Sequence, residues 1–372
     1  MRIAMIGHKR FGSREGGVEV VVTELARRMA AEGHEVTCYD RSGKDVMTGE
    51  KNLGERVVDG VRVVPVRTID AKGMAALSSS FFATLAAIKD RPDVIHYHAE
   101  GPCVPLPLAR RAGIRTIATI HGLDWQRAKW GKLASTYIKL GEKNAAKRAD
   151  EVIVLSRSAQ HYFRDAYGRK TVVIPNGINP KESRPAHAIT ERWGLEKDSY
   201  ILFLGRLVPE KRPELLIEAF SELETQKRLV IAGGGSDTSV YETALKQAAE
   251  GDPRILFTGF VQGEELAELY SNAYCYVLPS DVEGMPMSLL EAMAYGCCCV
   301  TSDIPECADV IADAGLTFRR GGCVGLRRAL ESLLSDCEET RSLGLTARAR
   351  ALEAFGWDSV VRWTIETYER DN

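Results

Sequence analysis

Short apolar segments rich in β-branched residues alternate with helical stretches along almost all of the 372 residues, and this alternation constrains the fold more than any other feature. Apolar strands separated by crossover helices indicate a doubly wound parallel sheet with helices on both faces. In the first half, strands are predicted at residues 2–6, 34–40, 94–98, 116–120, 152–155 and 171–174, with helices such as 18–32 and 130–148 between them. A hairpin is predicted around the Asp-Gly pair at residues 59–60.

The pattern is interrupted once and then restarts. Residues 175–199 contain three prolines, an Asn-Gly pair and many charges, which predicts a linker. Further strands follow at residues 200–204, 229–232, 255–257, 274–278 and 298–301, again with helices between them. We therefore expect an α/β chain of two Rossmann-like doubly wound domains, residues 1–178 and 179–356, that face each other across a cleft, where open α/β sheets bind ligands. The last helix, residues 357–372, carries Trp357, Trp363 and Tyr368 and is expected to pack back on the first domain.

Charge limits the classes of partner. Lys and Arg (49) nearly balance Asp and Glu (51), so a general nucleic-acid binder is not expected. The balance is uneven, because residues 1–178 carry 29 basic and 19 acidic side chains while residues 179–372 carry 20 and 32. The basic half predicts peripheral contact with an acidic membrane face, and the alternative is a chance asymmetry of solvated surfaces. There is neither a signal peptide nor an apolar run of about 18 residues, so a cytoplasmic chain is expected.

Cysteine and histidine spacing predicts no metal site. The nine cysteines are odd in number and include no Cys-x-x-Cys pair, so we expect mostly buried, reduced thiols. His96 and His98 lie on one face of a strand but lack an identifiable third ligand, and a role at the strand end is the favoured interpretation. No Asp-x-Asp motif and no dinucleotide fingerprint is present, so neither a metal nor another cofactor is predicted.

Two loops carry groups suited to phosphate. The loop over residues 7–19 places Gly16 and Gly17 at the start of a helix, where glycine lets the backbone approach a ligand and free amides can bind an anion. The alternative is a mobile loop. After the first strand of the second domain come Arg206, a forked donor, and Lys211, a point charge, which together suit a diphosphate. The alternative for this basic pair is a solvated face.

The most specific motif is a pair of glutamates seven residues apart. Glu283 precedes Gly284, Met285 and Pro286, and Pro286 favours the first turn of a helix in which Glu291 then lies. A carboxylate accepts hydrogen bonds from vicinal hydroxyls, so one glutamate is expected to hold a hexose and the other a ribose, with helix-start amides facing the phosphates between them.

A fourth motif follows a strand of the first domain. His121 is expected either to contact the sugar or to share in proton transfer, although a lone histidine at a strand end is often structural. Asp124, Arg127 and Lys129 follow it and are expected on the acceptor side.

Together these motifs resemble, in order, those of the retaining glycosyltransferases of family 4, which have the two-domain GT-B fold. The similarity covers nearly the whole chain, and residues 121–131 are similar to a bacterial polysaccharide-assembly branch. It rests on Gly16 to Glu19, His121, residues 175–178, residues 205–211 and residues 283–291. The resemblance implies that Gly16 and Gly17 approach the diphosphate and that His121 contacts the donor hexose. It further implies that Arg206 and Lys211 bind the pyrophosphate. Glu283 is then expected to contact the transferred sugar and Glu291 to hold the ribose, and Val261 is expected to lie beside the base.

The expected activity is hexosyl transfer from a UDP-sugar, or next from GDP-mannose, to a saccharide acceptor in cell-surface polysaccharide synthesis. The acceptor is expected to be lipid-linked. No carboxylate is clearly placed as a nucleophile, so a metal-independent same-face displacement, assisted by the leaving diphosphate, is favoured over the two-carboxylate scheme of glycosidases. Three alternatives stay open: a nucleotide-sugar epimerase on the same fold, a two-lobed sugar-binding protein without catalysis, and a dehydrogenase.

Overall fold

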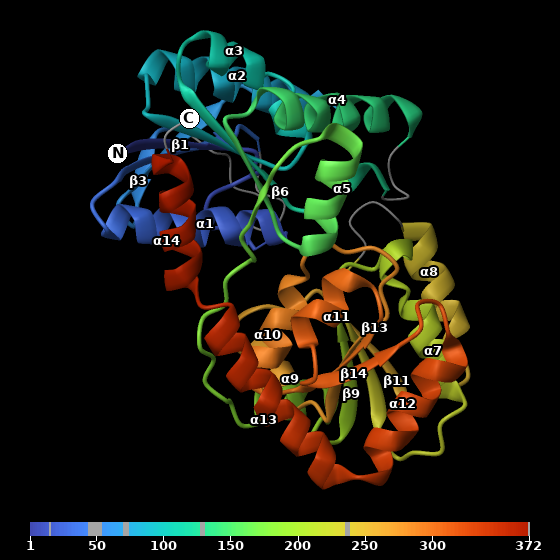
Figure 1. Cartoon of the computed structure of the whole chain (residues 1–372). Coiled ribbons are helices and arrows are strands. Elements are labelled where there is room, and N and C mark those ends of the chain that lie inside the picture. The colour runs from blue at the N-terminus through green and yellow to red at the C-terminus, as the bar shows by residue number, and fades with distance from the viewer. Residues whose placement is uncertain (15, 44–53, 70–73, 127–130, 235–238, 371–372) are drawn as a thin grey trace. The chain divides into compact units, whose positions relative to one another are not determined.

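The computed structural model describes residues 1–14, 16–43, 54–69, 74–126, 131–234 and 239–370 (Figure 1). It divides into two compact units, one made of residues 1–177 and 357–372 and the other of residues 178–356. Each unit is built around its own sheet.

The sheet of the first unit has the strand order β3-β4-β2-β1-β5-β6-β7-β8, and all neighbouring strands are parallel except β3 and β4. Asp59 and Gly60 both have positive φ (51° and 77°), as a two-residue hairpin turn requires, so the predicted hairpin is confirmed. The strands are β1 (Arg2–Ile6), β2 (Glu35–Arg41), β3 (Arg56–Val58), β4 (Val61–Val66), β5 (Val94–His98), β6 (Arg115–Ile120), β7 (Glu151–Val154) and β8 (Val172–Val173).

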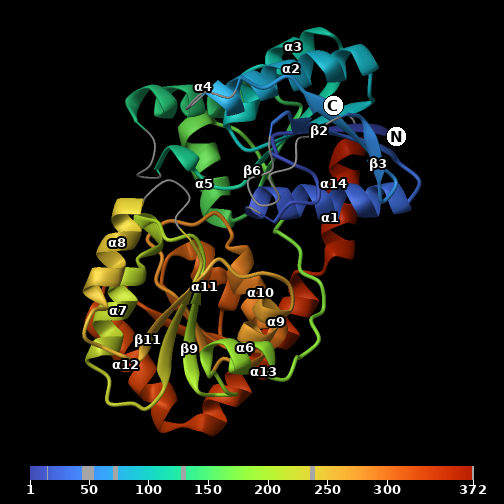
Figure 2. The same ribbon diagram turned by 180° about the vertical axis from the view of Figure 1, so that it is seen from behind.

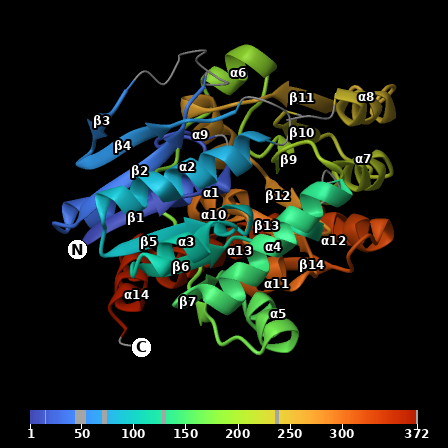
Figure 3. The ribbon, with the colours of Figure 1, turned by 90° about the horizontal axis from the view of Figure 1, so that it is seen from above.

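Helices cover both faces of this sheet. Figures 1 and 3 show α2, α3 and α4 over one face and α1 and α14 on the other. The long strands bury apolar side chains on both sides, which is why they read as continuous apolar runs in the sequence. The helices are α1 (Gly17–Ala31), α2 (Met74–Asp90), α3 (Leu106–Arg111), α4 (Lys132–Arg148), α5 (Arg157–Tyr167) and α14 (Trp357–Glu369), with short 3-10 turns η1 (Gly101–Cys103) and η2 (Asp124–Gln126).

The terminal helix α14 packs on the first unit, beside α1 (Figure 2). The Arg28 guanidinium of α1 lies 5.4 Å from the ring centroid of Trp357. A Cβ on Gly177 would lie 2.3 Å from the same indole, so only glycine fits against it. At the other end of the helix, the Tyr368 hydroxyl lies 2.7 Å from Nδ1 of His96 in β5.

The second unit holds a parallel sheet in the order β11-β10-β9-β12-β13-β14. Its strands are β9 (Tyr200–Leu204), β10 (Arg228–Ala232), β11 (Ile255–Gly259), β12 (Cys275–Leu278), β13 (Cys298–Ser302) and β14 (Gly315–Phe318). The α7, α8 and α12 helices cover one face and α9, α10 and α13 the other (Figure 1). The helices are α6 (Ala188–Trp193), α7 (Pro213–Ser221), α8 (Ser239–Ala248), α9 (Gly263–Asn272), α10 (Met287–Tyr295), α11 (Pro305–Ile311), α12 (Cys323–Ser335) and α13 (Cys337–Ala354), with a 3-10 turn η3 (Pro209–Lys211).

One local prediction was wrong. Residues 175–199 were expected to be linker throughout, but they contain the short helix α6. Its first turn is capped from a distant element, because Oε2 of Glu268 accepts the backbone N–H groups of His187 (2.9 Å) and Ile189 (3.1 Å). A cap supplied by α9, with Ile189 buried beneath it, leaves no local signal in the sequence.

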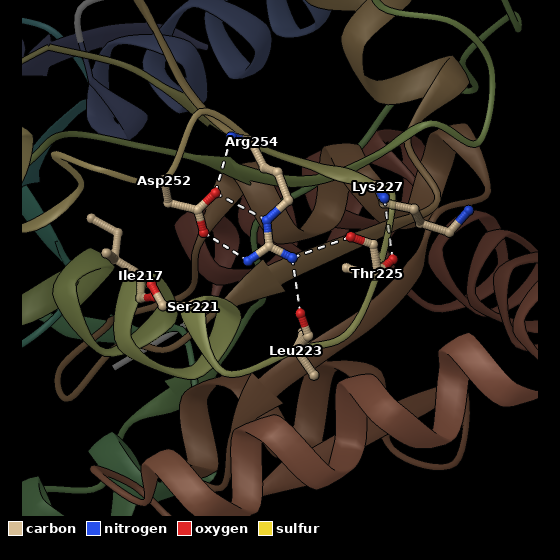
Figure 4. A network of polar contacts seen from close by, with 7 residues as sticks. All are labelled: Ile217, Ser221, Leu223, Thr225, Lys227, Asp252 and Arg254. Atoms are coloured by element: carbon tan, nitrogen blue, oxygen red, sulfur yellow. Dashed lines mark hydrogen bonds and ion pairs between the residues drawn. The ribbon is translucent and has the colours of Figure 1, made fainter.

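A polar network joins the segments that precede β10 and β11 (Figure 4). Arg254 donates to both carboxylate oxygens of Asp252 (2.9 and 2.7 Å) and to the carbonyl oxygens of Leu223 (2.8 Å) and Thr225 (3.1 Å). These contacts lie at the amino ends of the strands, so they stabilise the edge of the sheet opposite to the loops that follow the strands.

Of the nine cysteines, none is in a disulfide and seven are buried, as expected for small apolar side chains. None of the described helices is both long enough and apolar enough to cross a membrane.

Candidate functional site

In the second unit, the loops that follow β9 and β10 pack tightly against each other. Gly233, directly after β10, has a φ of 138°, and a Cβ there would lie 1.9 Å from the carbonyl oxygen of Gly205. The backbone N–H of Gly205 donates to Ala232 O (3.0 Å), and that of Gly233 donates to Gly259 O (2.8 Å). Three neighbouring strand ends are thereby held together, at the edge where open α/β sheets bind ligands.

An ion pair stands at this edge. Nζ of Lys211 lies 2.6 Å from Oε1 of Glu283, and the two side chains are 12% and 10% exposed. Ser280, which follows β12, donates its hydroxyl to the same oxygen (2.8 Å). The structure thus brings together two predicted site residues that are 72 positions apart, and it adds Ser280, which sequence reasoning missed.

Two further contacts order the loop that follows β9. The stem of Lys211 passes over Gly205, where a Cβ would lie 3.1 Å from the lysine Cδ. The N–H of Asp281 donates to Glu210 O (2.8 Å), which ties the loop after β12 to the turn η3. Arg206 lies between Gly205 and this turn, at the carboxyl end of β9 as predicted. The loop therefore holds the ammonium group of Lys211 in a fixed position at the sheet edge, a setting suited to an anion.

The helix α10 begins where the glutamate motif predicted. Pro286 is its N-cap residue, one position before the first helical residue, and Gly284, Met285 and Pro286 are buried. Glu291 lies in the second turn, is 8% exposed, and has Oε2 3.3 Å from the Tyr270 hydroxyl. The two glutamates are therefore on either side of a helix start, whose free amides favour negative charge.

Two tyrosines from neighbouring elements position this helix. The Tyr276 hydroxyl of β12 lies 2.8 Å from Ser288 Oγ, and the Tyr270 hydroxyl of α9 donates to Ser288 O (3.2 Å). Burial raises the pKa of both phenols well above their usual value, so both stay protonated hydrogen-bonding groups. Neither tyrosine was predicted, because their spacing relative to α10 appears only in the fold.

The turn after β11 places Val261 in a buried position (7% exposed). Phe260 beside it is a large aromatic side chain that is 54% exposed. Sequence reasoning missed Phe260, although an aromatic residue next to a turn expected to meet a nucleobase was a usable signal.

In the first unit, buried side chains hold the described part of the glycine-rich loop. Oδ1 of Asp40 accepts the N–H of Phe11 (2.8 Å) and of His8 Nε2 (3.0 Å), and Arg56 donates to Oδ2 (2.9 Å). Burial opposes ionisation of Asp40, but the His8, Phe11 and Arg56 donors outweigh it and lower the pKa of this carboxyl below its usual value. These contacts anchor the described part of the glycine-rich loop, which does not fit the alternative of a mobile loop.

Gly16 is the N-cap residue of α1, and Gly17 is its first residue. A Cβ on Gly16 would lie 2.6 Å from Oε2 of Glu19, whose other oxygen accepts the N–H of Lys9 (3.1 Å). Glu19 is buried, so the glycine leaves room for a carboxylate that folds the loop back on the helix.

His121 directly follows β6 and is linked to His98 at the end of β5. His98 Nδ1 lies 3.1 Å from His121 Nε2, and the rings of His96 and His98 pack together with centroids 4.0 Å apart and planes tilted by 34°. His96 contacts the Thr119 and Tyr368 hydroxyls (2.6 and 2.7 Å), so both of its nitrogens are engaged within the protein. No three His, Cys, Asp or Glu side chains of the described residues are grouped so as to hold a metal ion.

A buried carboxyl group supports the segment after His121. The N–H of Asp124 donates to Oε1 of Glu100 (2.9 Å), which is fully buried. Burial, and then the charge of Asp124, raise the pKa of Glu100 well above its usual value. Trp125 donates Nε1–H to Glu142 (2.9 Å), so two glutamates outside the predicted motif anchor η2. The predicted acceptor-side residues Arg127 and Lys129 lie outside the described residues.

Comparison with known proteins identifies the family. Residues 15–182 match the family model described as Glycosyltransferase Family 4, and residues 187–350 match the model of Glycosyl transferases group 1. A D-inositol 3-phosphate glycosyltransferase from Frankia alni is 30% identical over 95% of this chain and 94% of its own length. A GDP-mannose-dependent alpha-(1-6)-phosphatidylinositol monomannoside mannosyltransferase from Mycolicibacterium smegmatis is 27% identical over 93% of each chain.

Solved glycosyltransferase structures share this fold. HepE from Anabaena, solved in complex with UDP and glucose, superimposes with a TM-score of 0.80 at 18% identity over 99% of each chain. The predicted fold class, two Rossmann-like units with parallel sheets, is therefore confirmed. From its matched models, its relatives and its fold, this chain belongs to the glycosyltransferases of GT-B type, enzymes that act on nucleotide sugars.

Proposed function

We propose that this chain is a retaining, metal-independent hexosyltransferase whose second unit binds the nucleotide-sugar donor. The observation that carries the proposal is the Lys211–Glu283 pair beside the start of α10. It sets a cation and a carboxylate next to helix-start amides, which is what a donor with a diphosphate and a hydroxyl-rich sugar requires.

The donor-binding roles follow from this placement. Arg206 and Lys211 bind the pyrophosphate, and Glu291 holds the ribose hydroxyls. Glu283 with Gly284, Met285 and Pro286 contacts the transferred sugar, and the turn at Val261 lies beside the base. In the first unit, Gly16 and Gly17 approach the diphosphate and His121 contacts the hexose.

UDP-hexose is the first candidate donor. HepE, with the same fold, was solved with UDP and glucose, which supports a uridine donor. GDP-mannose is the second candidate, because the mycobacterial relative is GDP-mannose-dependent by name. A panel of nucleotide sugars separates the two candidates.

The chemistry we propose is a displacement on one face of the sugar. The bond between the anomeric carbon and the leaving diphosphate oxygen breaks, the acceptor hydroxyl oxygen forms the new bond on the same face, and the leaving phosphate oxygen takes the acceptor's proton. Arg206 and Lys211 stabilise the charge that develops on the diphosphate. Two carboxylates in the arrangement of a glycosidase are not required.

The acceptor we propose is a lipid-linked saccharide of cell-surface polysaccharide synthesis, reached from the cytoplasmic side of an acidic membrane. The surface formed by α2, η1, α3 and α4 supports this contact. A groove of about 250 Å³ between these elements is lined by Leu77, Phe81, Val104, Pro105, Pro107, Leu108 and Tyr137. Near it, Leu133 on α4 is 90% exposed and Leu85 on α2 is 43% exposed.

The charge of α4 fits the same partner. Its exposed charged side chains are basic, namely Lys139, Lys143, Lys147 and Arg148, and its one acidic residue, Glu142, is buried against Trp125, Tyr162 and Tyr167. Apolar side chains beside lysines are the composition of an interfacial membrane surface. The relative named for D-inositol 3-phosphate keeps a soluble anionic acceptor as the second candidate.

Sedimentation with vesicles tests the membrane contact. We expect the chain to bind vesicles that contain phosphatidylglycerol, to leave them at high salt, and to bind less when Lys143 and Lys147 are replaced by glutamate. The control is Lys246→Glu, which reverses the charge of an exposed lysine on α8 of the second unit. Equal binding to neutral vesicles, or binding that ignores salt, contradicts the proposal.

The transfer reaction is tested with UDP-hexose and an added saccharide acceptor, by NMR of the new anomeric proton and with EDTA present. An α-linked product from an α-linked donor, formed in EDTA, is expected. A β-linked product contradicts retention, and loss of activity in EDTA contradicts metal independence. Conversion of the donor sugar without an acceptor indicates the epimerase alternative.

A further inference from the structure

His98 is buried completely and sits between two other imidazoles. Its ring packs against His96 with centroids 4.0 Å apart and the two planes tilted by 34°, and its Nδ1 lies 3.1 Å from Nε2 of His121. The backbone around it is equally constrained, because a Cβ on Gly7 of the glycine-rich loop would lie 2.2 Å from the carbonyl oxygen of His98. The ring therefore has one fixed position, at the point where β1, β5 and β6 end.

The neighbouring His96 ring is itself held on both sides. His96 is engaged by Thr119 in β6 (2.6 Å) and by Tyr368 in α14 (2.7 Å). Burial lowers the pKa of His96 to about 3 and the pKa of His98 well below its usual value, so both imidazoles are neutral and each carries one N–H.

The protons can be placed from hydrogen-bonding partners. Nε2 of His98 is buried and has no hydrogen-bond partner among the described residues. A buried N–H without an acceptor is rarer and more costly than an unused lone pair, so the proton of His98 lies on Nδ1. That N–H points at His121 Nε2, which must then accept it.

We infer that His98 is a positioning residue, which donates Nδ1–H to His121 Nε2 and fixes the neutral His121 as its Nδ1–H tautomer. His121 then meets the donor sugar as a hydrogen-bond donor to a hydroxyl oxygen, not as a general base. This inference rests on the proposed contact of His121 with the hexose and chooses between the two roles that the sequence left open for it.

The test is side-chain ¹⁵N NMR of the full chain labelled at histidine, with the His121 signals assigned by their loss in His121→Gln. The expected spectrum shows proton-bearing Nδ1 and acceptor Nε2 for His121. In His98→Leu, which lacks the donor, the Nε2–H tautomer should appear. In His98→Asn, whose amide N–H stands near the position of Nδ1, the original tautomer should persist. A His121 with Nε2–H in the unmodified chain overturns the inference.

Kinetics separate positioning from simple loss of packing. We expect His98→Leu to lower kcat/KM about tenfold and His98→Asn to recover it to within about threefold. His96→Leu is the matched control, because His96 is buried beside His98 but has no hydrogen bond to His121. This variant should lower the melting temperature and leave the tautomer of His121 unchanged. Equal losses in His98→Leu and His98→Asn with an unchanged tautomer overturn the inference. The NMR measurement needs no enzymatic turnover. Its outcome can therefore contradict the inference about His98 even if the proposed transferase reaction is correct, and the reverse also holds.

Discussion

The ammonium group of Lys211 lies 2.6 Å from the carboxylate of Glu283, across 72 residues of chain. The lysine comes from the turn after β9 and the glutamate from the loop after β12, which are adjacent strands of one sheet. Both side chains are nearly buried, so neither group is well hydrated. Such a pair is sensitive to the loss of either partner, because the remaining charge is left without compensation.

Replacing Lys211 by alanine is expected to lower kcat at least about 100-fold, since the group proposed to stabilise the leaving diphosphate is lost. Initial rates of nucleotide release from UDP-hexose with acceptor measure this. The matched control is Lys246→Ala, which removes an exposed lysine paired with Glu242 at 2.8 Å on α8 and should leave the rate unchanged. A Lys211→Ala variant with a normal rate would remove the lysine from the proposed mechanism.

Replacing Gly233 by alanine is expected to cost about 3 kcal/mol of unfolding free energy and to abolish donor binding. The new methyl group would meet the carbonyl oxygen of Gly205 at 1.9 Å, in a backbone conformation with a φ of 138°. Gly251→Ala is the control, because its φ of 98° is also positive but no atom lies within 4 Å, so it should cost only about 1 kcal/mol. Urea unfolding of the two variants gives both values; similar costs would show that the contact with Gly205 is unimportant.

Arg254→Met is expected to destabilise the chain by about 2 kcal/mol and to leave kcat/KM of the remaining folded protein unchanged. The guanidinium donates to the carbonyl oxygens of Leu223 and Thr225 and to the Asp252 carboxylate (Figure 4). These groups precede β10 and β11, so they lie at the end of the sheet opposite to the loops that follow the strands. Thermal unfolding and kinetics at a temperature well below the transition separate the two quantities. A selective loss of kcat/KM would mean that this network acts on the site.

Acid is expected to destabilise the chain as the pH falls below about 6.5. The pKa of His96 is lowered by burial to about 3, and burial also lowers the pKa of His98 well below its usual value, so in this range the unfolded chain binds protons that the folded chain excludes. The contribution of these histidines to stability is therefore fully present above pH 6.5 and is lost as the pH falls, by about 1.4 kcal/mol per pH unit for His96 down to about pH 3.

This acid sensitivity is tested by measuring the free energy of unfolding against pH for the unmodified chain and for His96→Gln. The control is His187→Gln, because the side chain of His187 is 77% exposed. The slope should be shallower in His96→Gln and unchanged in His187→Gln. Identical slopes in all three would show that the buried imidazole is not the source of acid sensitivity.

Much of the fold could be predicted because doubly wound sheets repeat one local signal. Strands buried on both faces, such as β10 and β12, read as apolar runs, and Gly or Pro residues end the helices between them. Elements whose stability comes from distant partners could not be predicted. Helix α6 is an example, since its cap is Glu268 on α9.

The site likewise contains residues that local sequence predicts and residues that only the fold reveals. The loop positions of Arg206, Lys211, Glu283 and Glu291 follow from strand ends and from Pro286, which local sequence displays. The contacts that support these side chains do not follow from local sequence. Ser280 reaches Glu283, Glu100 reaches Asp124, and His98 reaches His121 only through the order of strands in each sheet. Which strands become neighbours is decided by packing of the whole unit, so these residues carry no signal at the level of a motif.

The most direct test of the central claim is the thermal stability of the chain and of Lys211→Ala with UDP, GDP, dTDP, ADP and their hexose derivatives, and with free sugars. A ligand that binds only the folded state raises the melting temperature by mass action. The account predicts that one base, UDP first, stabilises the unmodified chain and that this gain is largely lost in Lys211→Ala. Stabilisation by free sugars and by no nucleotide would contradict it and would favour a sugar-binding protein.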